Sequence, residues 1–199
     1  RFLMTEEKYL VATAENSFHI TVRNILNPLG YMFLGHGTDS ITLMRFVRSY
    51  HPDFIVVDLA MQWRELKRTL ETIDDEMLCF CILVGDHKDM EVLDFLENSK
   101  VISFCGKPLN KEILIQTVEM ASVNFRRISQ LDKKLKEATE KYEERMLIDK
   151  AKRILMKSEG LSEDDAYKYM RKKSMDTRTA MRDIAEYIIY RHESGYGIK

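Results

Sequence analysis

Residues 144–193 read ERMLIDKAKRILMKSEGLSEDDAYKYMRKKSMDTRTAMRDIAEYIIYRHE, and the function of the chain depends on how this stretch folds. Apolar residues recur three and four positions apart, which is the spacing of one helix face, and two breaks divide the stretch into three helices. The first helix is predicted to end at Gly160, because glycine readily adopts the left-handed conformation that closes a helix. Ser162 is predicted to cap the second helix, and residues 174–176 are expected to end it.

The third helix of this stretch has a continuous apolar side, formed by Met181, Ile184, Ala185, Ile188 and Ile189. A bundle of about fifty residues encloses a small core and is marginally stable by itself. The pattern therefore predicts three helices that pack together and also lean on a longer helix or on a partner chain.

Several short motifs in the last quarter of the chain occur together and in a fixed order. They are AKRILM at 151–156, SEDDAY at 162–167, then Arg171, Ser174, Met175 and Arg178, and finally IAEYI at 184–188. In this order and spacing they resemble the ANTAR module, an RNA-binding three-helix domain of bacterial antitermination regulators. The family usually has glycine where this chain has Arg153, a change that adds a cation.

The resemblance implies an RNA-binding surface made of basic side chains and a helix tip. The basic candidates are Lys150, Lys152, Arg153, Lys157, Arg171, Lys172, Lys173 and Arg178, with Ser174, Met175 and Thr177 shaping the tip. Guanidinium groups can pair with phosphates and can stack on unpaired loop bases. The alternative is a dimerisation bundle whose charged face is only solvated.

Composition limits the class of protein. The chain has 199 residues, of which 45% are hydrophobic and 32% charged, as in helix-rich globular domains. No apolar run is long enough to cross a membrane and no signal peptide is visible, so we expect a cytoplasmic protein. Residues 1–125 carry a charge balance of −6 and residues 126–199 one of +5, which fits a regulatory domain joined to a domain that binds a polyanion.

No metal or catalytic site is predicted. Cys79, Cys81 and Cys105 lie in apolar runs without metal-ligand spacing, so buried unpaired thiols are expected, and the five histidines are scattered. No nucleophile with a neighbouring base and no phosphate-binding glycine loop is present, so the chain is expected to be no enzyme and to use no cofactor.

The N-terminal half alternates short apolar runs with helical spacing. The predicted strands are residues 9–13, 31–35, 53–58, 78–84 and 101–104. Strict alternation of strand and helix predicts a doubly wound, five-stranded parallel sheet covered on both faces, over residues 6–110. The site of such an α/β domain lies at the carboxyl ends of its strands.

This domain resembles the receiver domain of response regulators, through Asp58 after the third strand and Lys107 with Pro108 after the fifth. The resemblance makes Asp58 and Lys107 the equivalents of the phosphoacceptor site. However, Thr13 and Ala14 stand where the family has the acidic pair that holds magnesium, and Gly85 stands where it has a hydroxyl residue. We therefore interpret the domain as a pseudo-receiver in which Asp58 and Lys107 form a structural ion pair, controlled by a protein partner.

A long helix is predicted to connect the two domains, from about residue 110 to residue 157. Its apolar positions are mostly spaced three and four apart, which is typical of a coiled-coil seam: Leu114, Val118, Ala121, Phe125, Ile128, Leu131, Leu135, Ala138, Tyr142 and Met146. We expect a linker helix over residues 111–143 that pairs two copies into a homodimer, followed by the ANTAR module at residues 144–193. The alternative is that this helix folds back onto the receiver-like domain.

Together these features predict a homodimeric RNA-binding transcription antiterminator that recognises stem-loops in leader transcripts. One alternative is a protein-interaction scaffold whose basic tip has no ligand. The other is a DNA-binding regulator, although the third helix of the bundle commits many of its side chains to a core and leaves few to read a major groove.

Overall fold

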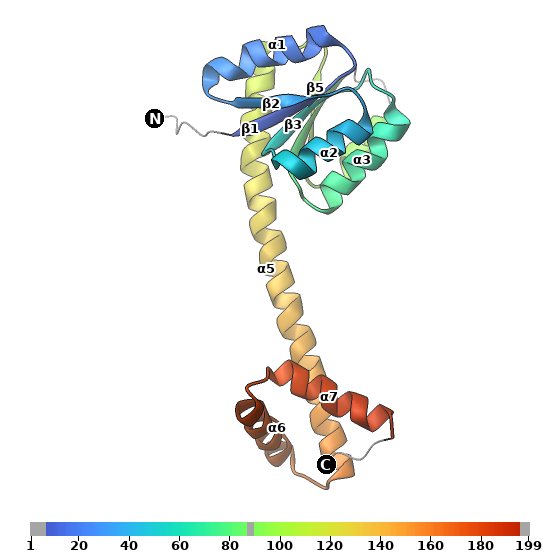
Figure 1. Cartoon of the computed structure of the whole chain (residues 1–199), viewed down its shortest axis with the longest axis vertical. Helices are drawn as coiled ribbons and strands as arrows, with labels where there is room; N and C mark the ends of the chain where they lie inside the picture. The colour runs from blue at the N-terminus through green and yellow to red at the C-terminus, as the bar shows by residue number, and fades with distance from the viewer. Residues whose placement is uncertain (1–6, 87–89, 196–199) are drawn as a thin grey trace. The chain divides into compact units, whose positions relative to one another are not determined.

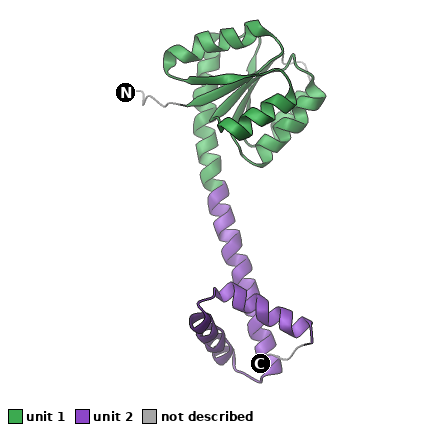
Figure 2. Ribbon diagram, in the orientation of Figure 1, with its two compact units in different colours: residues 1–131 green, residues 132–199 purple. Residues whose placement is uncertain are grey.

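The computed structural model describes residues 7–86 and 90–195 of the chain. These residues belong to two compact units, residues 1–131 and residues 132–199, shown in different colours in Figure 2. Each unit is built around hydrophobic side chains of its own.

The first unit contains one five-stranded sheet in which every neighbouring pair of strands is parallel (Figure 1). Its strands are β1 (Lys8–Ala12), β2 (Met32–Gly37), β3 (Phe54–Asp58), β4 (Phe80–Gly85) and β5 (Ile102–Gly106). Their order across the sheet is β2-β1-β3-β4-β5. The predicted doubly wound parallel sheet is therefore confirmed, with strand bounds that differ by one or two residues from the predicted ones.

Helices cover both faces of this sheet, as Figure 1 shows. They are α1 (Asn16–Leu26), the short 3-10 helix η1 (Asn27–Leu29), α2 (Ser40–Tyr50), α3 (Trp63–Asp75), α4 (Met90–Asn98) and the start of α5 (Lys111–Ser158). Side chains alternate along each strand, so Val56 packs with α1 and α5 while Val57 packs with α2, α3 and α4. This alternation explains why β3 reads as a continuous apolar run.

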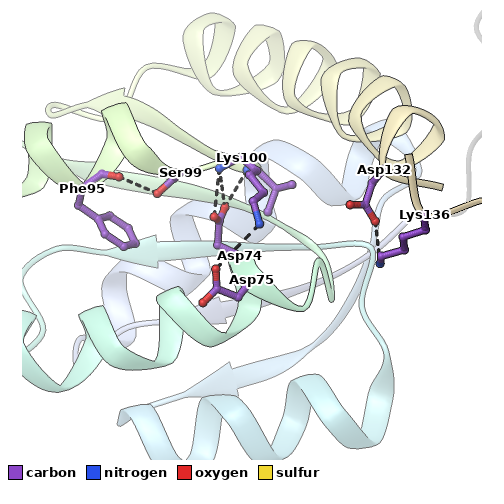
Figure 3. Close-up of polar contacts among 8 residues, drawn as sticks. Asp74, Asp75, Phe95, Ser99, Lys100, Asp132 and Lys136 are labelled. Carbon is purple, nitrogen blue, oxygen red and sulfur yellow. Dashed lines mark hydrogen bonds and ion pairs between the residues drawn. The ribbon is translucent and has the colours of Figure 1, made fainter. Parts of the chain in front are cut away.

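Asp74 joins the end of α3 to the start of β5. Its buried carboxylate accepts hydrogen bonds from the backbone N–H of Lys100, at 2.9 and 3.1 Å, and from that of Val101, at 2.8 Å (Figure 3). The hydroxyl of Ser99 donates to the carbonyl of Phe95 in the same turn. Because a buried carboxylate must be hydrogen-bonded, these contacts fix where the fifth strand begins.

The first turns of α5 belong to the first unit. Leu114, Val118 and Ala121 are buried in the same core as α1, and Phe125 packs against that core. The predicted coiled-coil seam thus includes positions that are already covered within the chain, which corresponds to the fold-back alternative for this segment. The first unit accordingly extends to residue 131, beyond the boundary predicted at residue 110.

Farther along α5 the apolar stripe is exposed. Leu131, Leu135 and Tyr142 are about two-thirds exposed, at 64%, 66% and 65%, and Met146 is 47% exposed. An i,i+4 ion pair between Asp132 and Lys136, drawn in Figure 3, lies on the same part of the helix. This segment presents apolar side chains that no other described residue covers.

The second unit consists of the end of α5 with α6 (Glu163–Thr177) and α7 (Met181–Glu193). Its buried side chains come from all three helices: Ala151, Ile154, Leu155, Ala166, Met170, Ile184, Ala185, Ile188 and Ile189. Gly160 has the left-handed φ of +66° that was predicted for the first break. The Ser162 hydroxyl accepts the N–H of Asp165 at 3.1 Å, which confirms the predicted cap.

The end of the second helix was predicted wrongly. The expected break at residues 174–176 lies inside α6, which ends at Thr177 and is closed by Arg178 with a left-handed φ of 52°. Ser174 does not break the helix because its hydroxyl donates to the carbonyl of Thr179 at 2.6 Å and so stabilises the turn that follows.

Candidate nucleic-acid interface

The structure brings Asp58 and Lys107 together at the carboxyl edge of the sheet. The Lys107 Nζ atom lies 2.7 Å from Oδ1 of Asp58, whose side chain is 1% exposed. The same carboxylate accepts the hydroxyl of Thr13 at 3.2 Å through Oδ2 and the backbone N–H of Ala60 at 3.0 Å through Oδ1. Both oxygens of the Asp58 carboxylate therefore accept hydrogen bonds within the first unit, and one of them also forms the ion pair with Lys107.

The position that would carry a hydroxyl residue in a receiver domain has no room for a side chain. A Cβ atom placed on Gly85 would lie 2.6 Å from Cδ1 of Leu59. A cleft of about 450 Å³ adjoins this point and is walled on one side by Trp63 and Val92. Leu59 would therefore have to shift to admit any side chain at position 85.

Magnesium does not fit the residues at this edge. The ion needs several well-placed oxygen ligands, and Thr13 and Ala14 replace the acidic pair of a receiver domain. Glu15, the nearest remaining acid in the sequence, is exposed, and its backbone N–H donates to the Thr13 hydroxyl at 3.0 Å. Among the described residues no group of three or more His, Cys, Asp and Glu side chains could hold a metal ion.

Two of the predicted basic residues form ion pairs between helices of the bundle. Lys152 is 15% exposed and lies 2.8 Å from carboxylate oxygens of both Asp149 and Glu163, which raise its pKa. Lys150 pairs with Glu193 at 2.8 Å, and this contact lowers the pKa of the Glu193 carboxyl. These lysines tie α5 to α6 and α7, so their positive charge is already compensated within the bundle.

Four of the other predicted cations are exposed to solvent on α5 and α6. Arg171 and Lys172 on α6 are exposed and form no ion pair in the described part of the chain. Lys157 is exposed near the end of α5, and Arg153 is exposed with its Nε donating to the carbonyl of Asp149 at 3.2 Å. Their uncompensated charge makes them the stronger candidates for phosphate contacts.

The tip between α6 and α7 is held by local hydrogen bonds. The Thr179 backbone N–H donates to the Ser174 carbonyl at 3.0 Å, and the Thr177 hydroxyl donates to the Lys173 carbonyl at 2.8 Å. Met175 is 70% exposed beside the exposed Arg178. Ser174 and Thr177 therefore shape the tip through contacts within the chain, whereas Met175 and Arg178 face outward.

Two tyrosines and two cationic side chains of α6 and α7 lie next to one another. The Lys173 Nζ atom lies 5.7 Å from the ring centroid of Tyr169 and 5.2 Å from that of Tyr187. The guanidinium carbon of Arg191 lies 5.9 Å from the Tyr187 centroid. Tyr187 and Arg191 were not among the predicted site residues, although a tyrosine precedes a cation by four positions in both helices, a spacing visible in the sequence.

A family model for the ANTAR domain matches residues 136–189 of the chain. This chain carries a C-terminal ANTAR domain. The match begins inside α5 and ends inside α7, so the ANTAR domain takes up the second half of the long helix together with the tip. All eleven predicted RNA-binding residues lie within it.

The whole chain is also similar to a known regulator. It is 24% identical over 182 residues to the transcriptional regulatory protein PdtaR of Mycobacterium tuberculosis, in strains CDC 1551/Oshkosh and ATCC 25618/H37Rv. This alignment covers 92% of the present chain and 89% of PdtaR. The similarity therefore spans both the ANTAR domain and the first unit.

Solved receiver domains share the fold of the first unit. One is the receiver domain of a modulated diguanylate cyclase from Desulfovibrio desulfuricans G20, with a TM-score of 0.54 and 20% identity over 61% of this chain and 98% of that one. Another is a CheY-like receiver protein from Methanospirillum hungatei JF-1, with a TM-score of 0.55 and 14% identity over 62% and 98%. At this identity the likeness establishes the receiver fold that precedes the ANTAR domain.

Proposed function

We propose that this protein is an RNA-binding transcription antiterminator that recognises stem-loops in leader transcripts. The observation that carries the proposal is the ANTAR domain with Arg171, Lys172 and Arg178 exposed on one helix and the turn that ends it. Binding to such stem-loops would stabilise them against formation of a terminator. The chain acts in this proposal by binding and performs no catalysis.

The dimer is part of the proposal and is supported by the exposed stripe on α5. A groove of about 490 Å³ in the second unit is lined by Tyr142, Met146 and Leu147 of α5 and by Arg182 and Glu186 of α7. Leu135, on the same helix of this unit, is also exposed, and a second copy would remove these apolar side chains from water. Two ANTAR domains would then face a transcript with paired stem-loops.

Control in this proposal comes through protein contact. The Asp58 carboxylate is buried and paired with Lys107, and Leu59 would have to shift to admit a side chain at position 85. Thr13 and Ala14 supply no acidic pair to hold magnesium, so no metal ion would help Lys107 to offset the charge of an incoming phosphoryl group. A regulatory protein that binds the receiver-like unit requires no such charge compensation.

Two other functions differ in what they predict for nucleic acids. A protein-interaction scaffold would bind structured and random RNA equally weakly. A DNA-binding regulator would prefer a duplex, but Ile184, Ile188 and Ile189 of α7 are buried and cannot read a groove. We find no observation that favours either function over RNA binding. Within the described residues no helix meets the length and hydropathy required to span a membrane.

A gel-shift series with the full chain tests the proposal. The probes are an RNA pool with tandem stem-loops and randomised loops, unstructured RNA of equal length, and duplex DNA. The proposal predicts selective retention of stem-loop RNA, and equal retention of stem-loop and unstructured RNA would contradict it. Arg171→Ala and Arg178→Ala should each weaken stem-loop binding by about 1–3 kcal/mol if the side chain touches a base, and by less, with a smaller salt dependence, if it touches only phosphates. Arg64→Ala, an exposed arginine on α3, is the matched control.

A further inference from the structure

Two half-exposed tyrosine rings lie next to lysine and arginine at the seam between α6 and α7. Tyr169 is 36% exposed and Tyr187 is 42% exposed, so part of each side chain is open to solvent. Lys173 is within cation–π distance of both rings, and Arg191 is within that distance of Tyr187. We refer to these four residues as the tyrosine–cation cluster.

The contacts of the tyrosine–cation cluster connect all four residues across α6 and α7. Its members come from two helices, and the Lys173 Nζ atom also lies 3.5 Å from the hydroxyl of Tyr169. Met170 and Ile188, which neighbour the two tyrosines in sequence, are fully buried and fix the faces that α6 and α7 turn outward. The two rings are therefore mounted on helix faces that are held by the core of the bundle, which lowers the entropic cost of binding a flat ligand on them.

Exposed aromatic rings next to cations form a surface suited to unpaired nucleotide bases. Every base has a flat face that can stack on a tyrosine ring, and base–aromatic stacking is a main source of affinity for single-stranded nucleic acid. The adjacent ammonium and guanidinium groups can contact the phosphates that flank a stacked base. Paired bases within a stem are inaccessible to such stacking, so the surface would select the loop of a hairpin.

We propose that the tyrosine–cation cluster is the loop-base subsite of the RNA interface. Unpaired loop bases stack on Tyr169 and Tyr187 while Lys173 and Arg191 contact the neighbouring phosphates. This inference rests on the proposed RNA-binding function and adds to it the part of the RNA that is recognised. Arg171 and Arg178 then provide contacts to the stem backbone outside this cluster.

A purely structural role makes a different prediction. If the cluster only joins α6 to α7, removal of a ring lowers thermal stability and leaves the affinity of the folded protein unchanged. If the rings bind bases, Tyr187→Phe keeps both the affinity and the stability, because the flat ring remains. Tyr187→Ala then lowers the affinity for stem-loop RNA while the salt dependence of binding stays constant, because no phosphate contact is lost.

The test measures binding of a stem-loop RNA, selected from the randomised-loop pool, to the full chain. We expect Tyr169→Ala and Tyr187→Ala each to weaken binding by about 5- to 150-fold, the range for loss of one stacked base. Tyr187→Phe should bind within about twofold of the unmodified protein. Tyr50→Ala is the matched control, because Tyr50 is 49% exposed on α2 of the first unit. Circular dichroism melts establish that each variant is folded.

A second measurement does not depend on the variants. A 2-aminopurine base placed in the loop should change its fluorescence when the unmodified protein binds, whereas the same base placed in the stem should not. Unchanged affinity in both folded alanine variants, or equal fluorescence changes at loop and stem, would overturn the subsite. Failure of the unmodified protein to bind any stem-loop would instead overturn the proposed function itself, so the two failures are distinguishable.

Discussion

The Nζ atom of Lys107 lies 2.7 Å from the Oδ1 atom of Asp58, and this contact places a lysine directly against the carboxylate at the expected phosphoacceptor position. Thr13 and the backbone of Ala60 complete the hydrogen bonding of that carboxylate. The ion pair is buried on its acidic side, so breaking it would leave an uncompensated charge. The ion pair therefore holds the Asp58 carboxylate in place at the carboxyl edge of the sheet.

We expect the protein not to become phosphorylated by a small phosphodonor. Incubation with acetyl phosphate and magnesium should leave the intact mass unchanged, because Asp58 is paired and the magnesium ligands are missing. Asp58→Asn is the matched control. A stoichiometric gain of one phosphoryl group that disappears in Asp58→Asn would contradict the pseudo-receiver interpretation.

Restoring a hydroxyl at position 85 should destabilise the first unit. Gly85→Ser places a Cβ atom 2.6 Å from Cδ1 and 2.9 Å from Cβ of Leu59, and such overpacking typically costs about 1–3 kcal/mol. Adding Leu59→Ala removes the Cδ1 contact and retains the Cβ contact, so it should recover only part of the loss. Urea unfolding of the single and double variants measures both effects. A Gly85→Ser protein as stable as the parent would show that Leu59 moves aside freely.

His19 should make the stability of the first unit depend on pH. Its ring stacks on His36 at 4.2 Å, and its Nδ1 atom is buried without a hydrogen-bond partner in the described structure. Burial, followed by the charges of His36 and Arg23, lowers the pKa of His19 from its ordinary value of 6.5. The unfolded chain therefore takes up this proton first, and the free energy of unfolding should fall as the pH drops from about 7 to about 5.

The comparison with His19→Phe isolates this effect. Phenylalanine can keep the ring contact with Phe33 but cannot be protonated, so its free energy of unfolding should fall less over the same pH range. Carboxylates that titrate near the lower limit affect both proteins alike and cancel in the difference. Parallel pH profiles for the two proteins would exclude His19 as the source.

The exposed stripe on α5 should hold two chains together. Leu131→Glu with Leu135→Glu places charges on side chains that are 64% and 66% exposed, so each chain should still fold while the coiled-coil seam is lost. Analytical ultracentrifugation should show a dimer for the parent at micromolar concentration and a monomer for the double variant. A parent that sediments as a monomer would remove the dimer from the proposal.

The sequence predicts this fold well wherever local pattern and burial agree. The continuous apolar run at residues 54–57 predicts a buried strand, and β3 is buried along its whole length. Ser162 is predicted to cap a helix, and its hydroxyl accepts an N–H from the first turn of α6. Both features depend on residues that are close in the sequence. The end of α6 was missed because Ser174 donates its hydrogen bond to Thr179, a choice that only the folded turn determines. The coiled-coil seam was predicted to start at Leu114, which is instead buried in the core of the first unit. Its spacing in the sequence is the same whether it faces the sheet or a second helix.

The site was harder to predict than the fold for a related reason. Lys152 and Arg171 look equally basic in the sequence, yet Asp149 and Glu163 compensate one of them and leave the other exposed. The pairing of Lys173 with Tyr187 joins residues on different helices, so spacing along the chain alone does not reveal it. Which cations remain free is a property of the packed bundle.

The most direct test of the central claim is a map of RNA crosslinks on the full chain. Stem-loop RNA carrying 4-thiouridine in the loop is irradiated with the protein, and the crosslinked peptides are identified by mass spectrometry. The account predicts crosslinks within residues 163–193, concentrated around the tyrosine–cation cluster. Crosslinks confined to residues 7–131, or no more crosslinking than with unstructured RNA, would contradict it.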